Sequence, residues 1–253
     1  MSEIFAVTSG KGGVGKTTIT ANLATLLSKL GKDVLAIDGN FTTPNLGLQL
    51  GMYLPEYTIH DILAGKADVS KSIYYHPLGF KIIPGSLNIE DMRNVDPERF
   101  VDVVKQFDSD YTIVDTAAGL GKEAIYGIEA SDKVLLVTTP DTTSLSDAAR
   151  TERIAYELNK EIVGVILNIV PKRIENLAIK KAGIFLESPV IATLPEDPRV
   201  RECNNLKIPI VERYPNSRFS IELKKFAYSL AGYEYVEEIK FDLLSRFLSW
   251  LLK

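Results

Sequence analysis

The sequence predicts an α/β fold in which helices cover both faces of a doubly wound, mostly parallel sheet. Two observations support this: short apolar runs alternate with amphipathic segments, and several of the runs are apolar at every position. Such runs are typical of strands covered on both faces, and the alternation favours parallel pairing through helical crossovers. The expected strands span residues 4–8, 34–38, 80–83, 111–115, 134–138, 162–168 and 190–194. The expected helices span residues 17–30, 97–107, 143–159, 174–187 and 218–230.

The composition is that of an ordinary globular protein: 253 residues, 45% hydrophobic and 25% charged, enough for one sizeable core. The formal net charge is -4, whereas proteins that hold nucleic acid through its phosphates usually carry a basic surplus. We therefore expect no specific nucleic acid partner, although a local basic patch is compatible with this charge. The single cysteine, Cys203, excludes an internal disulfide and a multi-cysteine metal site within one chain.

The two ends of the chain bear on its location. The beginning lacks the basic and then apolar pattern of a signal peptide. No run reaches the length of about 18 apolar residues that marks a membrane-spanning helix. We expect a cytoplasmic protein that is either soluble or bound peripherally to the cytoplasmic face of a membrane.

A glycine-rich segment follows the first predicted strand and opens the first predicted helix. Residues 10–17, with the sequence GKGGVGKT, fit the pattern G-x-x-x-x-G-K-[ST] in the structural context that this motif requires. Glycines allow the backbone N–H groups to turn around phosphates, and the helix N-terminus adds the positive end of its dipole. Lys16 would reach the β- and γ-phosphates, and the Thr17 hydroxyl would bind Mg²⁺.

The same loop has a competing interpretation. Gly10, Gly12 and Gly15 also match G-x-G-x-x-G, and Asp38 is near the place of a ribose-binding acid, so a dinucleotide-binding turn is the alternative. The adjacent Lys16 and Thr17 have no role in that alternative and two in the phosphate loop, which we therefore favour. Asp115 supports it, because an aspartate that ends a strand beside the loop can hold the Mg²⁺ water shell. Its alternative role is that of a helix cap or turn residue.

The loop also carries a second lysine, Lys11, before the glycine pair. The sequence SGKGGVGKTT at residues 9–18 resembles the deviant Walker A motif of the MinD/ParA superfamily of P-loop ATPases. Residues 34–46 resemble switch I of that family, residues 115–120 resemble switch II, and residues 167–168 and 194–198 resemble the adenine-side loops. The resemblance covers essentially the whole chain and is closest to the MinD branch.

The resemblance implies that the protein binds ATP and Mg²⁺. The implied nucleotide-binding residues are Gly10, Lys11, Gly12, Gly13, Val14, Gly15, Lys16, Thr17, Thr18, Asp115, Asn168, Pro195 and Asp197. The implied metal-binding residues are Thr17, Asp38 and Asp115. The implied catalytic residues are Lys11, Lys16, Asp38 and Asn40.

The resemblance also implies a mechanism. ATP would join two protomers face to face, and Lys11 of one protomer would reach the phosphates bound by the other. Dimerisation would thereby be coupled to hydrolysis, since a cation supplied in trans stabilises charge only once the dimer has closed. We expect a slow ATPase that cycles on and off a membrane and serves spatial organisation such as division-site placement. An activator or cargo protein would be a further partner.

Two positions depart from the family pattern. Asn40 stands where the MinD switch I usually has an acid that helps to position the attacking water. Ala117 stands where proline is common in switch II, and its loop should be slightly looser because proline fixes φ.

The end of the chain predicts a separate element. We expect an ATPase domain over residues 1–232, followed at residues 233–253 by a short linker and an amphipathic helix. Polar residues spaced by three and four form one face of this helix. Its membrane-contacting residues would be Phe241, Leu244, Phe247, Leu248, Trp250, Leu251 and Leu252. A helix of this kind lies in the lipid interface and resembles the MinD membrane-targeting tail; the alternative is a helix packed on its own core or on a partner.

Other functions remain as alternatives. A ParA-type DNA-partition ATPase shares the loop but needs a basic DNA-binding surface, and the iron–sulfur relatives need cysteines that this chain lacks. A ligase of the same fold would use the loop to activate a carboxylate and would have little use for the terminal helix. Asn40 also favours an adaptor that binds ATP only to dimerise, with little hydrolysis.

Asn40→Asp should raise the rate of ATP hydrolysis. Asparagine accepts a hydrogen bond from the attacking water but cannot take its proton, whereas aspartate does both. Phosphate release at saturating Mg-ATP measures the effect, with Asn40→Ala as the control that should not gain activity. An unchanged rate in Asn40→Asp would show that this position does not limit turnover.

Overall fold

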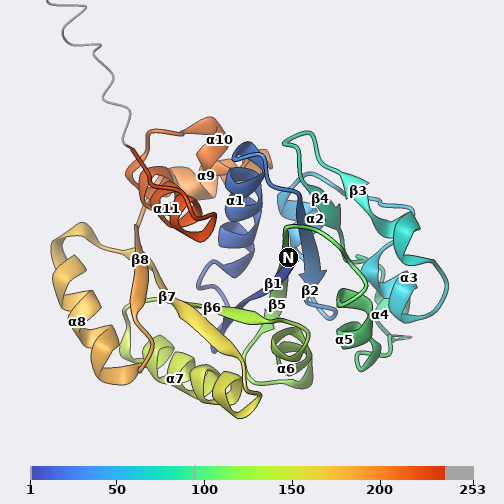
Figure 1. Ribbon diagram of the computed structural model, residues 1–253, viewed down its shortest axis with the longest axis horizontal. Coiled ribbons are helices and arrows are strands. Elements are labelled where there is room, and N and C mark those ends of the chain that lie inside the picture. The colour runs from blue at the N-terminus through green and yellow to red at the C-terminus, as the bar shows by residue number, and fades with distance from the viewer. Residues whose placement is uncertain (1, 94, 237–253) are drawn as a thin grey trace, which may run out of the picture.

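The computed structural model describes residues 2–93 and 95–236 (Figure 1). Within them an eight-stranded sheet has the order β3-β4-β2-β5-β1-β6-β7-β8. Neighbouring strands are parallel except for the antiparallel pair β3 and β4. The strands are β1 (Glu3–Ser9), β2 (Val34–Gly39), β3 (Tyr74–Tyr75), β4 (Lys81–Ile83), β5 (Tyr111–Ala118), β6 (Lys133–Thr138), β7 (Glu161–Val170) and β8 (Val190–Pro195). The predicted fold class and every predicted strand are confirmed; the short edge strand β3 was not predicted.

Helices cover both faces of this sheet (Figure 1). They are α1 (Lys16–Lys29), α2 (Leu46–Gln49), α3 (Ile59–Leu63), α4 (Ile89–Arg93), α5 (Arg99–Val104), α6 (Lys122–Glu129), α7 (Thr142–Glu157), α8 (Glu175–Phe185), α9 (Pro198–Leu206), α10 (Ile210–Arg213) and α11 (Arg218–Leu230), with 3-10 turns η1 (Val69–Ser72) and η2 (Lys172–Ile174). The predicted helices are present, although α5 is shorter than expected. The shorter helices were not predicted, because four to nine residues carry little periodic signal.

The alternation of side chains along β1 explains the doubly wound arrangement. Phe5 and Val7 belong to the largest apolar cluster, with α1 and α11. Ile4 and Ala6 point to the opposite face, into clusters that include residues of α3, α5, α6 and α7. Since successive residues of a strand face opposite sides, a strand that is apolar throughout requires a helical layer on each side.

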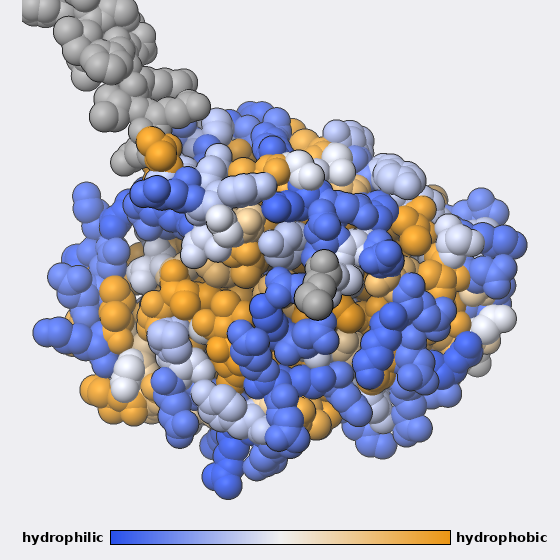
Figure 2. Space-filling view, viewed as in Figure 1, coloured by the Kyte–Doolittle hydropathy of each residue, from blue (hydrophilic) through white to orange (hydrophobic). Residues whose placement is uncertain are grey.

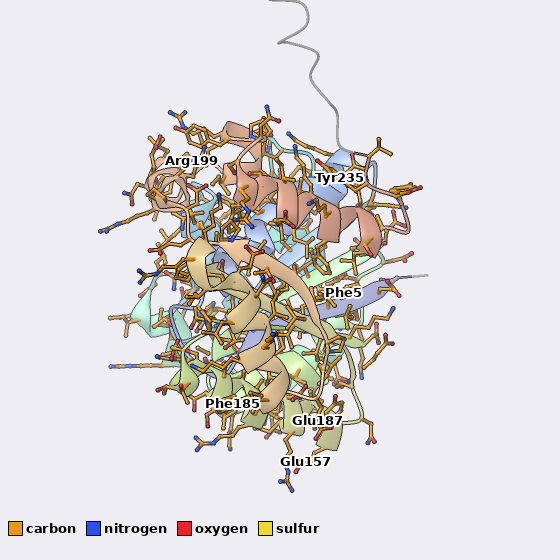
Figure 3. The ribbon with its side chains drawn as sticks, turned by 90° about the vertical axis from the view of Figure 1, so that its left-hand side faces the viewer. Phe5, Glu157, Phe185, Glu187, Arg199 and Tyr235 are labelled. Carbon is orange, nitrogen blue, oxygen red and sulfur yellow. The ribbon has the colours of Figure 1, made fainter. Side chains whose placement is uncertain are left out.

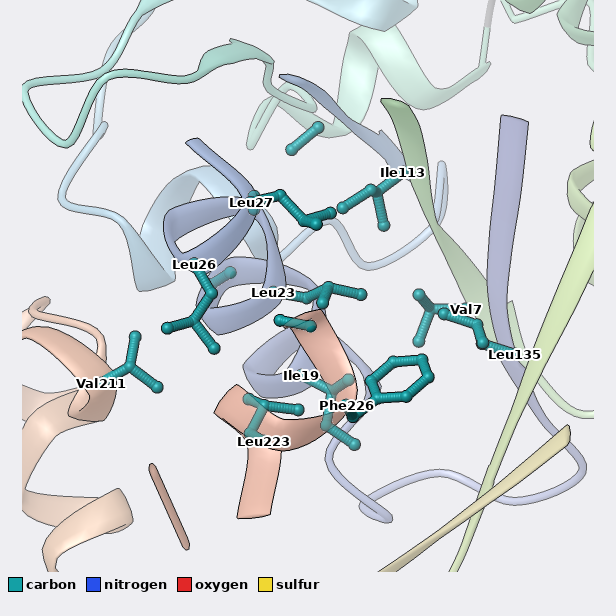
Figure 4. Packing of buried hydrophobic residues seen from close by; sticks show 14 of the residues in the cluster. Val7, Ile19, Leu23, Leu26, Leu27, Ile113, Leu135, Val211, Leu223 and Phe226 are labelled. Carbon is teal, nitrogen blue, oxygen red and sulfur yellow. The ribbon is translucent and has the colours of Figure 1, made fainter. Parts of the chain in front are cut away.

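The largest cluster fixes the position of α1 (Figure 4). Leu23 and Leu27 of α1 are fully buried with Ile113 of β5 and with Leu223 of α11. Full burial of one such side chain stabilises the fold by about 1.5–3 kcal/mol. Helix α1 is therefore held along its length between the sheet and α11, and its first turn is fixed beside the carboxyl ends of β1 and β5.

The membrane prediction falls on residues that the structure does not describe. Phe241, Leu244, Phe247, Leu248, Trp250, Leu251 and Leu252 all lie within residues 237–253, outside the described ranges. None of the helices in the described part of the chain has the length and apolar character needed to span a bilayer. On the face shown in Figure 2, hydrophilic side chains break up the hydrophobic groups.

Candidate nucleotide site

The glycine-rich loop joins β1 to α1, as the motif requires. Gly13 and Gly15 have φ of 82° and 99°, values that favour glycine. Gly15 is the N-cap of α1 and provides no side-chain cap, so the first N–H groups of this helix are available to an anion. At Gly10 an added Cβ would lie 2.2 Å from the backbone oxygen of Asp147 in α7. Only glycine fits there, because the loop lies directly against the α7 backbone.

A cavity of about 780 Å³ opens in front of this loop. Four parts of the chain line it: the glycine-rich loop, the switch I segment after β2, the end of β5 with the start of α6, and the end of α9. The lining includes Gly12, Gly13, Gly15, Lys16, Thr17, Thr18, Asn40, Thr42, Thr43, Asn45, Gln49, Thr116, Ala117, Ala118, Glu123 and Asn204. Its volume is within the range of small-molecule sites.

Among the described residues, two lysines line this cavity, Lys207 after α9 and Lys16 at the glycine loop. Lys16 is the one beside the predicted phosphate position. Its side chain is buried, and its Nζ donates to Ser9 Oγ at 2.9 Å. Ser9 Oγ in turn donates to the backbone oxygen of Lys11 at 2.8 Å. Burial lowers the pKa of Lys16, and the nearby charge of Asp115 opposes this shift. A buried ammonium group held at the end of a glycine loop fits the phosphate groups of a nucleotide.

Two buried carboxyl groups lie beside the lysine. Asp38 and Asp115 are opposite each other in the register of β2 and β5, and they are 1% and 2% exposed. Asp38 accepts hydrogen bonds from the N–H groups of Leu46 (2.9 Å) and Asn40 (3.2 Å). Burial raises the pKa of both carboxyls, and the charge of Asp115 raises that of Asp38 further.

The same carboxyl groups fit a magnesium ion. Oδ1 of Asp115 has no hydrogen-bond partner among the described residues, and the nearby Thr17 hydroxyl lowers the pKa of this carboxyl group. Carboxylate and hydroxyl oxygens are the donors that Mg²⁺ prefers, and a cation would relieve the repulsion between the two acids. The structure thus brings together Thr17, Asp38 and Asp115, the residues predicted to bind metal.

Asn40 closes a turn of switch I. Its Nδ2 donates to the backbone oxygen of Thr43 at 2.7 Å, and its Oδ1 accepts from the Thr43 N–H at 3.2 Å. The neighbouring Thr42 donates from Oγ1 to Oε1 of Glu123 at 2.6 Å. Switch I is thereby linked to the start of α6. Sequence reasoning missed Glu123, which comes after the switch II pattern.

Lys11 does not face the cavity that its own loop forms. Its side chain is 47% exposed, and its Nζ lies 3.9 Å from Oδ1 of Asp141. Asp141 is the N-cap of α7 and accepts a hydrogen bond from the Ser144 N–H at 3.0 Å. The Lys11 side chain thus lies at the surface beside the start of α7, and Lys11 is absent from the lining of the cavity.

A second cavity, of about 700 Å³, adjoins the first. The two cavities share Gly13, Gly15, Thr18 and Asn204 in their linings, and the second adds Asn168, Pro195 and Asp197. The predicted adenine-side residues therefore line a cavity that adjoins the one in front of the glycine loop.

The residues predicted to lie beside adenine have distinct partners. Nδ2 of Asn168 donates to the backbone oxygen of Val14 at 2.7 Å, which fixes the direction of its Oδ1. Asp197 caps α9 through the Arg199 N–H and forms two bonds of 2.9 and 2.7 Å with the Arg199 guanidinium. This pairing lowers the pKa of Asp197. Figure 3 shows Arg199 and Tyr235 at opposite ends of the layer that holds α11.

Sequence reasoning also missed a polar network behind Thr18. Oγ1 of Thr18 accepts from Gln49 Nε2 at 3.1 Å and from Asn204 Nδ2 at 3.2 Å. Gln49 also donates to Oδ1 of Asn204 at 2.9 Å. With both lone pairs of Thr18 engaged, its hydroxyl proton remains to donate to a ligand. The two amides come from the short helices α2 and α9, so no local pattern places them together.

The strand, glycine loop and helix, with the buried lysine and the carboxyl pair, define a P-loop nucleotide-binding protein. Residues 5–210 match the family model described as the CobQ/CobB/MinD/ParA nucleotide binding domain. The chain belongs to this family, which confirms the resemblance found in the sequence.

Individual proteins of this family are similar over nearly their whole length. An uncharacterized ATP-binding protein of Methanocaldococcus jannaschii is 38% identical over 242 residues, which cover 95% of this chain and 92% of the relative. The crystal structure of the cell division ATPase MinD of Pyrococcus furiosus is 33% identical, with a TM-score of 0.86, over 92% of this chain and 99% of that one. The septum site-determining protein MinD of Pyrococcus horikoshii, complexed with Mg-ADP, is 33% identical, with a TM-score of 0.85, over 91% and 96%.

The stability of the nucleotide-free protein should fall as pH rises. The raised pKa values of Asp38 and Asp115 mean that the folded chain holds protons that the unfolded chain has already released. This stabilisation is complete below the ordinary carboxyl pKa of about 4 and is lost as pH rises through the raised values. The free energy of unfolding should therefore decrease less with pH in Asp115→Asn than in wild type, by on the order of 1 kcal/mol.

Urea unfolding without nucleotide or Mg²⁺, at about pH 5 and about pH 8, measures this effect. Asp102→Asn, which changes an exposed aspartate of α5, is the matched control and should keep the wild-type pH dependence. An Asp115→Asn protein with the same pH dependence as wild type would contradict the raised pKa of the Asp115 carboxyl group.

Proposed function

We propose that this protein is a MinD-like ATPase that binds Mg-ATP, dimerises with ATP between the protomers, associates with a membrane and hydrolyses ATP slowly. The observation that carries the proposal is the continuous cavity whose loop holds one buried lysine, Lys16, while its second lysine, Lys11, faces the surface. Membership of the family and the likeness to the two MinD structures support it.

Different residues of the cavity would bind different parts of the nucleotide. Lys16 and the loop N–H groups would neutralise the phosphates, and Thr17, Asp38 and Asp115 would hold Mg²⁺. The ion supplies further neutralisation of the phosphate charge when bound. Oδ1 of Asn168 is an acceptor whose direction is fixed by the bond of its amide to Val14, and it suits the amino group of adenine better than the carbonyl of guanine.

Lys11 is suited to act on a partner protomer. Its ion pair with Asp141 spans 3.9 Å between half-exposed side chains, and pairs of this kind contribute at most about 1 kcal/mol. The lysine is therefore released at little cost when a second protomer presents phosphate. A cation that arrives only on closure couples hydrolysis to dimerisation.

Membrane binding follows from the sequence of residues 237–253, which lie outside the described ranges. One short helix gains little net binding, because the ordering of its backbone offsets much of the burial of its apolar face. Two such helices on an ATP-joined dimer would raise the membrane affinity by a factor of about 10²–10⁴ over that of one helix. The ATP dimer would thus bind the membrane, and the monomer would remain in solution. Spatial organisation, such as division-site placement, is the corresponding biological role.

A second candidate function is an ATP-dependent dimeric adaptor with little hydrolysis. The bonds of the Asn40 side chain to Thr43 favour it, since they engage both ends of the amide that stands in place of the usual acid. The rate of phosphate release by the wild-type dimer separates the two functions.

Lys11→Ala should bind ATP within about twofold of wild type but lose ATP-dependent dimerisation and hydrolysis. The reason is that Lys11 does not line its own cavity and a missing trans cation costs about 10³-fold or more in rate. Titration with a fluorescent ATP analogue measures binding, and sedimentation velocity measures the dimer. The control is Lys180→Ala, an exposed lysine of α8. A Lys11→Ala chain that still forms the ATP dimer would rule out the trans role.

Co-sedimentation with anionic vesicles of phosphatidylglycerol and phosphatidylethanolamine should carry the full chain into the pellet with Mg-ATP and leave it in solution with Mg-ADP. A chain that ends at Tyr235 should bind ATP but stay in solution with both nucleotides. Vesicle binding by this shortened chain, or equal binding in ATP and ADP, would refute the membrane switch.

A further inference from the structure

We propose that Glu123 is a catalytic residue whose carboxylate holds the attacking water and takes its proton during ATP hydrolysis. This inference rests on the ATPase function proposed above. It assigns to α6 the chemistry that the family pattern places in switch I and that Asn40 cannot perform.

Glu123 has a unique place among the acids near the phosphate loop. Of the described residues that line the cavity of about 780 Å³, it is the only one with a carboxylate. Asp38 and Asp115 are almost fully buried beside the loop and are absent from that lining, which suits them to the metal. Glu123 is partly exposed in the first turn of α6, directly after the switch II segment.

Asn40 is not free to take the same role. Its Nδ2 donates to the backbone oxygen of Thr43 at 2.7 Å and lies 3.0 Å from the Thr43 hydroxyl oxygen. Its Oδ1 accepts from the N–H and the hydroxyl of Thr43, each at 3.2 Å. An amide engaged in this way closes a turn, and an amide oxygen does not act as a base near neutral pH.

Thr42 orients the Glu123 carboxylate. The Thr42 hydroxyl donates to Oε1 at 2.6 Å. The second oxygen, Oε2, remains to accept a hydrogen bond from a water molecule in the cavity. Because Thr42 belongs to switch I, this bond places the carboxylate at the junction of the two switch segments.

Hydrolysis replaces one bond of the γ-phosphorus by another. The water oxygen forms a bond to the γ-phosphorus, while the bond from that phosphorus to the β–γ bridging oxygen breaks and leaves its electron pair on ADP. The proton of the attacking water passes to Glu123, which later returns it to solvent. Lys16 counters the charge that develops on the phosphate oxygens.

The same contacts would also suit a purely structural latch between switch I and α6, and two variants separate these roles. Glu123→Gln keeps an oxygen that accepts from Thr42 but removes the base. Thr42→Val removes the tether but keeps the carboxylate. A base predicts that Glu123→Gln loses far more activity than Thr42→Val, whereas a latch predicts the reverse.

The experiment measures single-turnover hydrolysis of labelled Mg-ATP by the full chain, together with ATP affinity and thermal stability. We expect Glu123→Gln to lower the hydrolysis rate by about 10²-fold, the lower end of the effect of a positioned base, with ATP affinity and thermal stability close to wild type. Thr42→Val should lose less than about tenfold.

Two further variants complete the test. Asn40→Asp introduced into Glu123→Gln should restore activity by about tenfold or more, because it returns a carboxylate to the cavity. Glu129→Gln changes an exposed glutamate at the other end of α6 and should hydrolyse ATP at the wild-type rate.

A wild-type chain that binds ATP but releases no phosphate would overturn the ATPase function itself. Wild-type hydrolysis with a Glu123→Gln rate within about twofold, or equal losses in Glu123→Gln and Thr42→Val, would overturn only the role of Glu123.

Discussion

The burial of α1 between the sheet and a second layer of helices determines where the groups of the site lie. Its apolar residues pack on β1 and β5 on one side and on α11 on the other. Polar residues inside this layer are also bonded: Asn22 donates to the backbone oxygen of Thr18 at 2.7 Å and accepts from the Val211 N–H at 3.0 Å. A helix held on all sides cannot shift without breaking the core. The glycine loop at its start, and Lys16 and Thr17 in its first turn, therefore keep a fixed position beside the strand ends.

The sheet and α1 hold charged groups whose burial is unfavourable without a ligand. Two carboxyl groups face each other across β2 and β5, one of their oxygens has no hydrogen-bond partner among the described residues, and a lysine is buried next to them. Burial of unsatisfied polar groups costs about 1–3 kcal/mol each. A nucleotide with its metal ion carries the complementary charges. Part of the free energy of ligand binding is thus stored in the folded chain beforehand, since the packing of α1 prevents the site from relaxing.

The sequence predicts the strands, the long helices and the glycine loop well. It predicts poorly the contacts between residues that are far apart in the chain. The strands that are apolar throughout and the long helices carry strong periodic signals, and the loop motif depends on glycine conformations that no other residue adopts easily. Gln49, Glu123 and Asn204 escaped notice, because each lies in a helix of four to nine residues and meets the loop only through tertiary packing. Asp197 was expected to bind nucleotide, and the structure shows its carboxylate engaged by Arg199. The role of residues 237–253 remains a prediction from their amphipathic pattern.

The close approach of the loop to α7 has a mechanical consequence. Gly10 lies so near the backbone oxygen of Asp147 that no side chain intervenes, and the cap of the same helix, Asp141, is the ion-pair partner of Lys11. Side chains between two elements absorb small displacements by changing rotamer, whereas contacting backbones do not. The contact with α7 therefore adds to the packing of α1 in keeping the loop in place. The backbone of α7 is thus in direct contact with the glycine loop, although no residue of α7 lines the cavity.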